Sequence, residues 1–109
     1  MPGRVRTRRR FALFAAPSSR GQSGPLRVIY VASDTADTRV DVAYAISRRL
    51  GGAVARNRLR RRLRALVDGL DPLPRPGSYL IRCGNETGIL TYDELHHHLI
   101  QALERAGVL

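Results

Sequence analysis

The chain has 109 residues and suits one domain of ordinary size, residues 1–109, in which we expect residues 1–7 to be a disordered basic tail. A hydrophobic content of 43% is enough for a core, and no apolar run is long enough to span a bilayer. Basic residues number 19 against 9 acidic ones, a net charge of +10, so the composition predicts a polyanionic partner such as a nucleic acid.

The single cysteine, Cys83, excludes an internal disulfide and suits a reducing compartment. The segment from Arg4 to Arg10 is basic, but the N-terminal region lacks the apolar stretch and the small-residue cleavage site of a secretory signal. We therefore expect a cytoplasmic protein, and a basic transit peptide is the alternative left open.

The residue pattern predicts an α+β sandwich with helices on an open sheet. "LRVIYVAS" (26–33) is rich in β-branched and aromatic residues and is predicted to be a strand, and "VDVAYAIS" (40–47) alternates well enough to be its hairpin partner. The other expected elements are a short helix near residues 8–15, a loop over 17–25, a long helix over 55–70, a proline-rich loop over 71–77, a strand over 78–84 and a final helix.

The final helix has clear start and stop signals. Thr91 followed by Glu94 forms a capping box, and Gly107 is a natural end. Its expected apolar face consists of Leu95, Leu99, Ala102, Leu103 and Ala106.

The long helix "ARNRLRRRLRALVDGL" (55–70) combines a core face with a dense basic face. One stripe at helical spacing holds Leu59, Leu63, Leu66, Val67 and Leu70. The opposite side holds Asn57, Arg60, Arg61 and Arg64, flanked by Arg58 and Arg62. No acid follows until Asp68, so like charges repel without i to i+4 pairing, and a phosphate backbone would relieve that repulsion. The alternative is an ordinary basic surface helix.

The stretch "ISRRLGGAVARNRLRRRLRAL" (46–66) resembles the signature of the bacterial ribonuclease P protein component. The matching residues are Ser47, Arg48, Arg49, Gly51, Ala53, Val54, Arg56, Asn57, Arg58, Arg60, Arg61 and Arg64. Phe11, Tyr30 and "LTYDEL" (90–95) also fit the family, so the resemblance covers nearly the whole chain.

The resemblance implies a protein without catalytic residues that assists a catalytic RNA. That RNA uses Mg²⁺, held mainly by the RNA and its substrate, to remove the 5′ leader of precursor tRNA. The expected partners are the catalytic RNA and the leader, with no metal site in the chain, no membrane and no small-molecule substrate.

Two RNA-binding surfaces follow from the resemblance. The catalytic RNA is expected on Arg56, Asn57, Arg58, Arg60, Arg61 and Arg64. The single-stranded leader is expected in a cleft between the N-terminal helix and the sheet, which would be lined by Phe11, Phe14, Tyr30, Ser47, Arg48 and Arg49. For Phe11 and Phe14, a role as core anchors of the first helix is the alternative.

The implied fold is a two-layer α+β sandwich, similar to domain 2 of ribosomal protein S5, with a four-stranded sheet against helices. One short strand of that sheet has no clear place in this sequence. The long helix would make a left-handed crossover between parallel strands, against a rule that about 98% of such connections obey.

Other signals favour no separate chemistry. Three consecutive histidines, His96–His98, point in different directions on a helix, whereas metal ligands need spacing i to i+4. Cys83 has no evident base beside it in the sequence, and the acids show no spacing typical of a protein nuclease.

Two other function classes are weighed against this reading. A ribosomal or ribosome-assembly protein that binds RNA fits the composition but does not explain the ordered run from Ser47 to Arg64. A DNA-binding or membrane-surface basic helix fits the charge but not the surrounding strands.

Overall fold

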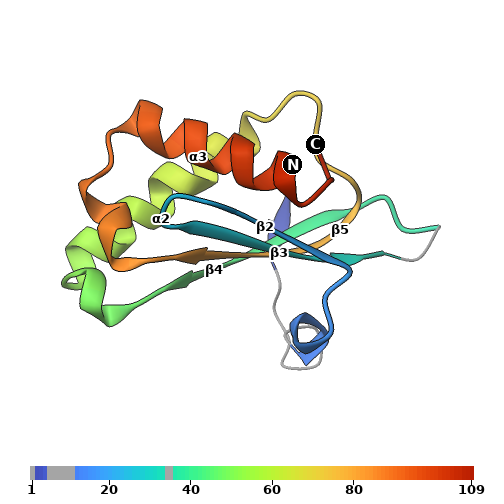
Figure 1. Ribbon diagram of the computed structural model, residues 1–109, viewed down its shortest axis with the longest axis horizontal. Coiled ribbons are helices and arrows are strands. Elements are labelled where there is room, and N and C mark those ends of the chain that lie inside the picture. Colours follow the sequence, from blue (N-terminus) through green and yellow to red (C-terminus); the bar gives the residue numbers. More distant parts are fainter. Residues whose placement is uncertain (1, 5–11, 34–35) are drawn as a thin grey trace.

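The computed structural model describes residues 2–4, 12–33 and 36–109. Over these ranges the sheet has five strands, and both α-helices cover the same side of it (Figure 1). The strands are β1 (Gly3–Arg4), β2 (Ser19–Ser23), β3 (Leu26–Ala32), β4 (Val40–Ile46) and β5 (Gly77–Cys83). The helices are α2 (Ala53–Asp68) and α3 (Tyr92–Arg105), with short 3-10 helices η1 (Leu13–Ala15), η2 (Arg48–Leu50) and η3 (Asn85–Ile89). The α+β sandwich is confirmed, and the sheet has one strand more than the four expected.

The strand order is β1-β4-β5-β3-β2, so the predicted hairpin between residues 26–33 and 40–47 is wrong. Both segments form strands, but β5 lies between them, antiparallel to β3 and parallel to β4. Arg82 is the one exposed residue of β5. A strand that is apolar on both faces is stable only where both faces are covered, so β5 takes the centre of the sheet.

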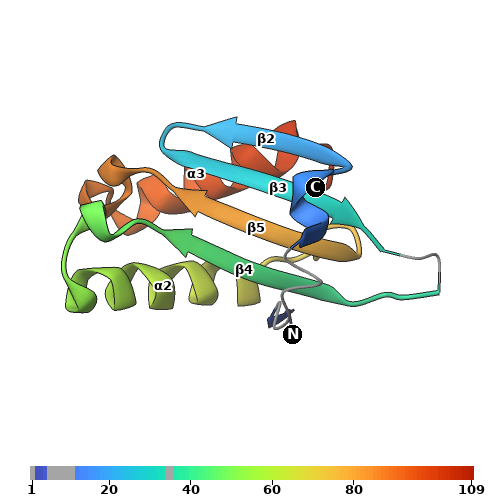
Figure 2. The same cartoon turned by 90° about the horizontal axis from the view of Figure 1, so that it is seen from below.

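Helix α2 connects the neighbouring parallel strands β4 and β5. In Figure 2 the helices lie behind the sheet, β4 and β5 both point left, and β5 lies above β4. This arrangement is a left-handed crossover, as the resemblance implies.

The predicted loop over residues 17–25 is wrong, because Ser19–Ser23 form the edge strand β2, antiparallel to β3. The strand packs so closely on α3 that only small side chains fit between them. A Cβ atom added at Gly21 would lie 2.0 Å from the backbone oxygen of Ala102. Small and polar residues therefore form this strand without the β-branched pattern from which strands are predicted.

Little of the expected N-terminal structure falls within the described residues. Of the helix predicted near residues 8–15, the structure describes η1 and its flanks, and residues 8–11 lie outside the described ranges. In the predicted disordered tail, Gly3–Arg4 instead pair in parallel with β4.

Two hydrophobic clusters lie on opposite faces of the sheet. The larger cluster fills the space between the sheet and the helices and includes the predicted apolar faces of both. Its helix residues are Leu59, Leu63, Leu66, Val67, Leu95, Leu99, Ala102, Leu103 and Ala106. The smaller cluster lies on the face that neither α2 nor α3 covers, here called the open face, and consists of Phe14, Ile29, Ala43 and Leu80.

The capping box of α3 is confirmed. The Thr91 hydroxyl accepts from the Glu94 amide at 3.1 Å, and the Glu94 carboxylate accepts from the Thr91 amide at 2.9 Å. These hydrogen bonds to Thr91 lower the pKa of Glu94. Gly107 follows the helix with φ of +74°, a conformation that glycine adopts readily. No helix among the described residues combines the length and the apolar character needed to cross a membrane.

Candidate RNA interface

Helix α2 presents most of the residues expected to bind the catalytic RNA. Its buried stripe faces the sheet, so the other side of the helix faces water. The term arginine face is used here for the side chains of Asn57, Arg58, Arg60, Arg61 and Arg64. Of these, Asn57, Arg58 and Arg61 are exposed, and Arg60 and Arg64 are half-buried.

Asn57 orients one of these arginines. Its side-chain oxygen accepts a hydrogen bond of 2.8 Å from Arg60 Nη1, one turn further along the helix. No arginine of α2 pairs with a carboxylate within the described residues. Within the described residues the arginine face therefore forms no ion pair, and its guanidinium groups can bind phosphate oxygens.

Arg56 differs from the other arginines expected at this surface. It precedes Leu59 by three residues and Leu63 by seven, which places it at the margin of the buried stripe. Its side chain is half-buried, and Nε is enclosed with no hydrogen-bond partner among the described residues. Arg56 thus lies at the margin of the buried stripe and is not part of the arginine face.

The open face of the sheet forms a second basic surface. Arg27 of β3 and Arg82 of β5 stand directly opposite each other on neighbouring strands, and both are exposed. Gln22 of β2 stands opposite Arg27 and accepts a hydrogen bond of 3.3 Å from it. Like charges directly opposite each other destabilise a sheet, so an anion between them would be favourable. We call Arg27 and Arg82 the sheet arginines.

The sequence reasoning missed the sheet arginines. Arg27 in "LRVIYVA" and Arg82 in "GSYLIRC" each alternate with residues of the main core. The pattern of each strand alone therefore indicates that its arginine points to the face opposite that core. What the sequence did not show is that β3 and β5 are neighbours, which brings the two side chains together.

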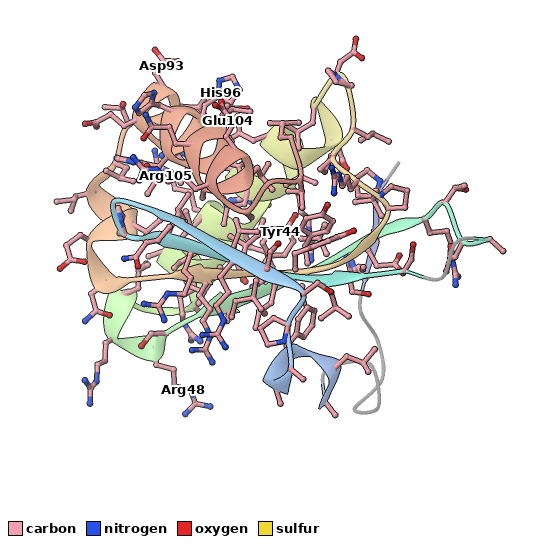
Figure 3. All side chains as sticks on the ribbon, turned by 45° about the vertical axis from the view of Figure 1, so that its right-hand side comes forward. Tyr44, Arg48, Asp93, His96, Glu104 and Arg105 are labelled. Carbon is pink, nitrogen blue, oxygen red and sulfur yellow. The ribbon has the colours of Figure 1, made fainter. Side chains whose placement is uncertain are left out.

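The predicted residues Ser47, Arg48 and Arg49 lie at the same end of the sheet. They follow the end of β4, where Ala45 stands beside Arg82 in the register of the parallel strands. The Ser47 hydroxyl accepts from the Arg49 amide at 3.1 Å and so caps η2. Both arginines are exposed, and Arg48 projects on the side of the sheet opposite to α3 (Figure 3). A basic surface thus continues from the sheet arginines to η2.

The aromatic part of the expected leader cleft needs correction. Tyr30 is 7% exposed, belongs to the main core, and donates a hydrogen bond of 2.7 Å to the Pro76 oxygen. It therefore lies on the helix side of the sheet, away from Phe14. Phe14 is 8% exposed and covers Ile29 and its neighbours on the open face, which fits the role of a core anchor. Phe11 lies outside the described residues.

The histidines of α3 form no metal site in the described part of the chain, where no group of three or more His, Cys, Asp or Glu residues is placed to hold an ion. His98 instead lies 2.8 Å from the Ser23 hydroxyl through Nδ1, and so connects α3 to β2.

Comparison with known proteins identifies the family. A family model described as Ribonuclease P matches residues 2–107. The chain belongs to the ribonuclease P protein family. Ribonuclease P protein components are among its relatives: that of Symbiobacterium thermophilum is 37% identical over 75% of this chain and 72% of its own length. That of Shouchella clausii is 31% identical over 88% of this chain and 81% of its own length.

Solved ribonuclease P proteins have the same fold. A mutant of the Staphylococcus aureus RNase P protein superposes with a TM-score of 0.86 at 16% identity, over 97% of this chain and 89% of the other. The Thermotoga maritima RNase P protein gives a TM-score of 0.79 at 20% identity, over 94% of this chain and 96% of the other.

As a member of this family, the chain is the protein subunit of ribonuclease P, the endoribonuclease that processes the 5′ end of tRNA. It works in a ribonucleoprotein, so its partner is RNA, as the net charge predicts. A ribosomal or ribosome-assembly function is not favoured.

Proposed function

We propose that the two basic surfaces of this ribonuclease P protein bind different RNAs. The arginine face of α2 binds the catalytic RNA, and the sheet arginines with η2 bind the 5′ leader of precursor tRNA. The chain acts as one RNA-binding domain in the cytoplasm, a reducing compartment that suits the free thiol of Cys83. Magnesium is held mainly by the catalytic RNA and the substrate.

The rigidity of the arginine face supports its assignment to the catalytic RNA. Folded RNA is bound through its phosphates and its shape, which requires charges held at fixed positions. A helix anchored by a buried stripe holds Arg61 and Arg64 in this way, and Asn57 orients Arg60.

The facing pair of sheet arginines is the observation that carries the leader assignment. A single strand binds along a basic groove, with its bases stacked on aromatic rings or on guanidinium planes. Tyr30 is turned into the core, so among the described residues the guanidinium planes of Arg27 and Arg82 offer the stacking surfaces at this end of the open face. Half-buried Ala45 stands beside Arg82 on the neighbouring strand and provides apolar surface there.

The assignment is tested with the protein bound to a bacterial ribonuclease P RNA. The measured quantities are 5′ cleavage at low magnesium and the ratio of the affinities for precursor and mature tRNA, for wild type and for Arg27→Ala and Arg82→Ala. Each lost leader phosphate contact should lower the salt slope for precursor tRNA by about 0.7 and leave mature tRNA binding unchanged. Arg75→Ala, also exposed but within the proline-rich loop, is the matched control.

If both sheet variants keep the wild-type ratio while their melting is unchanged, the leader does not lie on the open face. If the wild-type protein does not stimulate 5′ cleavage, the whole assignment is lost.

A further inference from the structure

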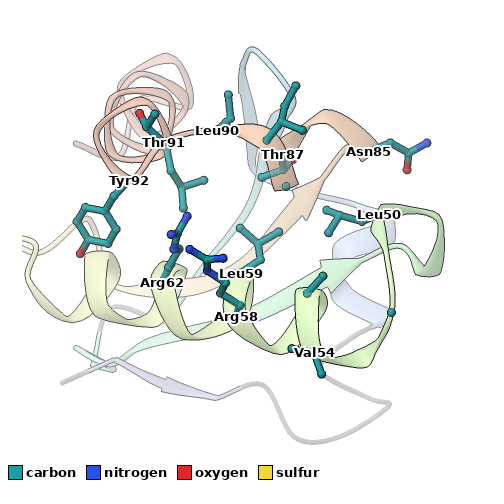
Figure 4. Close-up of a pocket in the computed structure, with 15 residues that line it drawn as sticks. Leu50, Val54, Arg58, Leu59, Arg62, Asn85, Thr87, Leu90, Thr91 and Tyr92 are labelled. Atoms are coloured by element: carbon teal, nitrogen blue, oxygen red, sulfur yellow. The ribbon is translucent and has the colours of Figure 1, made fainter.

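A groove separates the N-terminal half of α2 from η3 and the start of α3 (Figure 4). Its volume is about 890 Å³, and the side chains that matter here are Leu50, Val54, Arg58, Arg62, Ile89 and Tyr92. Volumes up to about 1,000 Å³ are typical of sites that hold a small organic molecule. The groove lies on the flank of α2 that faces α3, whereas Asn57, Arg60 and Arg64 line a separate hollow on the other flank.

Apolar side chains at the rim of the groove are unusually exposed. Val54 is 82% exposed, Ile89 is 83% exposed and Tyr92 is 44% exposed. They come from three separate elements that meet only in the folded protein. Exposed apolar side chains gathered at one concave place mark a binding site more often than scattered ones do.

Two arginines point into the same groove. Arg58 and Arg62 stand one turn apart on α2, and in Figure 4 both side chains extend from the helix toward the segment that leads into α3. Neither has a hydrogen bond or an ion pair within the described residues. Glu94, in the first turn of α3, accepts a hydrogen bond from the Thr91 amide in the capping box and pairs with neither arginine. The groove therefore combines an apolar rim, one aromatic ring and two unpaired cations.

We propose that this groove binds one unpaired nucleotide of the catalytic RNA. Its base lies against Tyr92 and Ile89, and its phosphate lies between Arg58 and Arg62. A nucleotide is the partner that matches both halves of the site, since an apolar peptide would leave the cations unpaired and a bare phosphate would leave the apolar rim in water.

The position of the groove selects the catalytic RNA over the leader. The groove shares α2 with the arginine face and opens on the helix side of the sheet, whereas the sheet arginines lie on the open face. This inference rests on the proposed function, because it assumes that α2 contacts the catalytic RNA.

The first test compares two variants that introduce the same charge, Ile89→Glu in the groove and Leu73→Glu in the proline-rich loop. Both positions are exposed, so neither change should unfold the protein. The dissociation constant for a bacterial ribonuclease P RNA, without tRNA, should rise more for Ile89→Glu than for Leu73→Glu. Equal effects of the two variants would overturn the proposal.

The second test uses the ring of Tyr92. Tyr92→Ala should weaken binding of the catalytic RNA by about five- to 100-fold, the loss of one stacked base, without changing the salt slope. Tyr92→Phe keeps the ring and should bind as the wild type does. Chemical probing of the bound RNA should find an unpaired nucleotide that wild type and Tyr92→Phe protect and Tyr92→Ala exposes.

The outcomes separate this inference from the proposed function. If Arg61→Ala weakens binding but no protected nucleotide depends on Tyr92, the groove proposal fails and the arginine face stands. If Tyr92→Ala weakens precursor tRNA binding alone, the occupant is not the catalytic RNA. If wild type does not bind the catalytic RNA, both proposals fail.

Discussion

At the scale of single residues, the two sides of α2 should respond to mutation in opposite ways. Arg60→Ala, Arg61→Ala or Arg64→Ala should weaken catalytic RNA binding and change the free energy of unfolding by no more than about 0.5 kcal/mol. Each lost phosphate contact should lower the salt slope by about 0.7 to 0.9. Leu63→Ala should do the reverse and lower the unfolding free energy by roughly 2 to 5 kcal/mol, because this side chain is fully buried.

Binding isotherms at several salt concentrations and urea unfolding of the same variants measure both quantities. If the arginine variants bind with the wild-type salt slope, the arginine face is only a surface. That result would favour the alternative interpretation of the sequence, in which the long helix is an ordinary basic surface helix.

Cys83 illustrates how burial decides the chemistry of one residue. Burial raises the pKa of its thiol to about 12, and the charge of Arg60 opposes this only in part. The thiol therefore stays protonated at neutral pH, and only the thiolate reacts with alkylating agents. Iodoacetamide at pH 8 should label the folded protein at least about a hundredfold more slowly than the urea-unfolded protein. Similar labelling rates in mass spectrometry would show that the thiol is accessible and ionised.

At the scale of elements, the contact between β2 and α3 depends on a missing side chain. An added Cβ at Gly21 would lie 2.0 Å from the Ala102 oxygen and 2.5 Å from the Ala106 nitrogen, both backbone atoms of the last turns of α3 and its C-terminal cap. Backbone cannot move aside as the end of a flexible side chain can. Gly21→Ala should therefore lower the unfolding free energy by about 1 to 3 kcal/mol, as overpacking does.

Gln22→Ala is the control for this prediction. Gln22 is adjacent in sequence but exposed, and its side chain contacts Arg27 and Gly24. Its contact with α3 is a hydrogen bond from Arg105 to the backbone oxygen, which Gln22→Ala keeps. Its effect on urea unfolding should stay within about 0.5 kcal/mol. Equal stability of the two variants would mean that β2 can move away from α3 without loss.

At the scale of the whole molecule, the fold places the two basic surfaces on different sides of the sheet. Asp93 and Glu104 lie on α3, on the far side of the sheet from Arg48 (Figure 3). The open face carries Arg27 and Arg82, and α2 carries the arginine face; none of these arginines forms an ion pair within the described residues. Two RNAs can therefore approach from different directions, and the acidic residues of α3 lie away from the open face.

Tyr30 tests this division between layers. Its ring lies 4.9 Å from that of Tyr79, and its hydroxyl is bonded to the Pro76 oxygen, so it joins the sheet to the proline-rich loop. Tyr30→Ala should lower the unfolding free energy by roughly 3 to 5 kcal/mol. Once the protein is folded, the ratio of the affinities for precursor and mature tRNA should equal that of wild type. A ratio that falls in a stably folded variant would put Tyr30 back in the leader site.

The sequence by itself determined the elements with strong local signals. The capping box at Thr91 and Glu94, the period of the leucines in α2 and the β-branched run of β3 each depend on residues close together in the chain. The same holds for the ordered run from Ser47 to Arg64, which was enough to indicate the family and therefore the function. Local spacing sets which residues share a face, so these features could be predicted without the fold.

Only the tertiary structure decided which strands are neighbours. No local signal shows that β5 enters between β3 and β4, that a small and polar segment forms β2 against α3, or which face of β3 lies under the helices. Alternate side chains of a strand point to opposite faces of the sheet. The helices cover the face of β3 that holds Tyr30, so Tyr30 lies in the core, and pairing with β5 brings Arg27 beside Arg82 on the other face. Such pairings join residues far apart in sequence, and their energy comes from burial that exists only after the sheet has assembled.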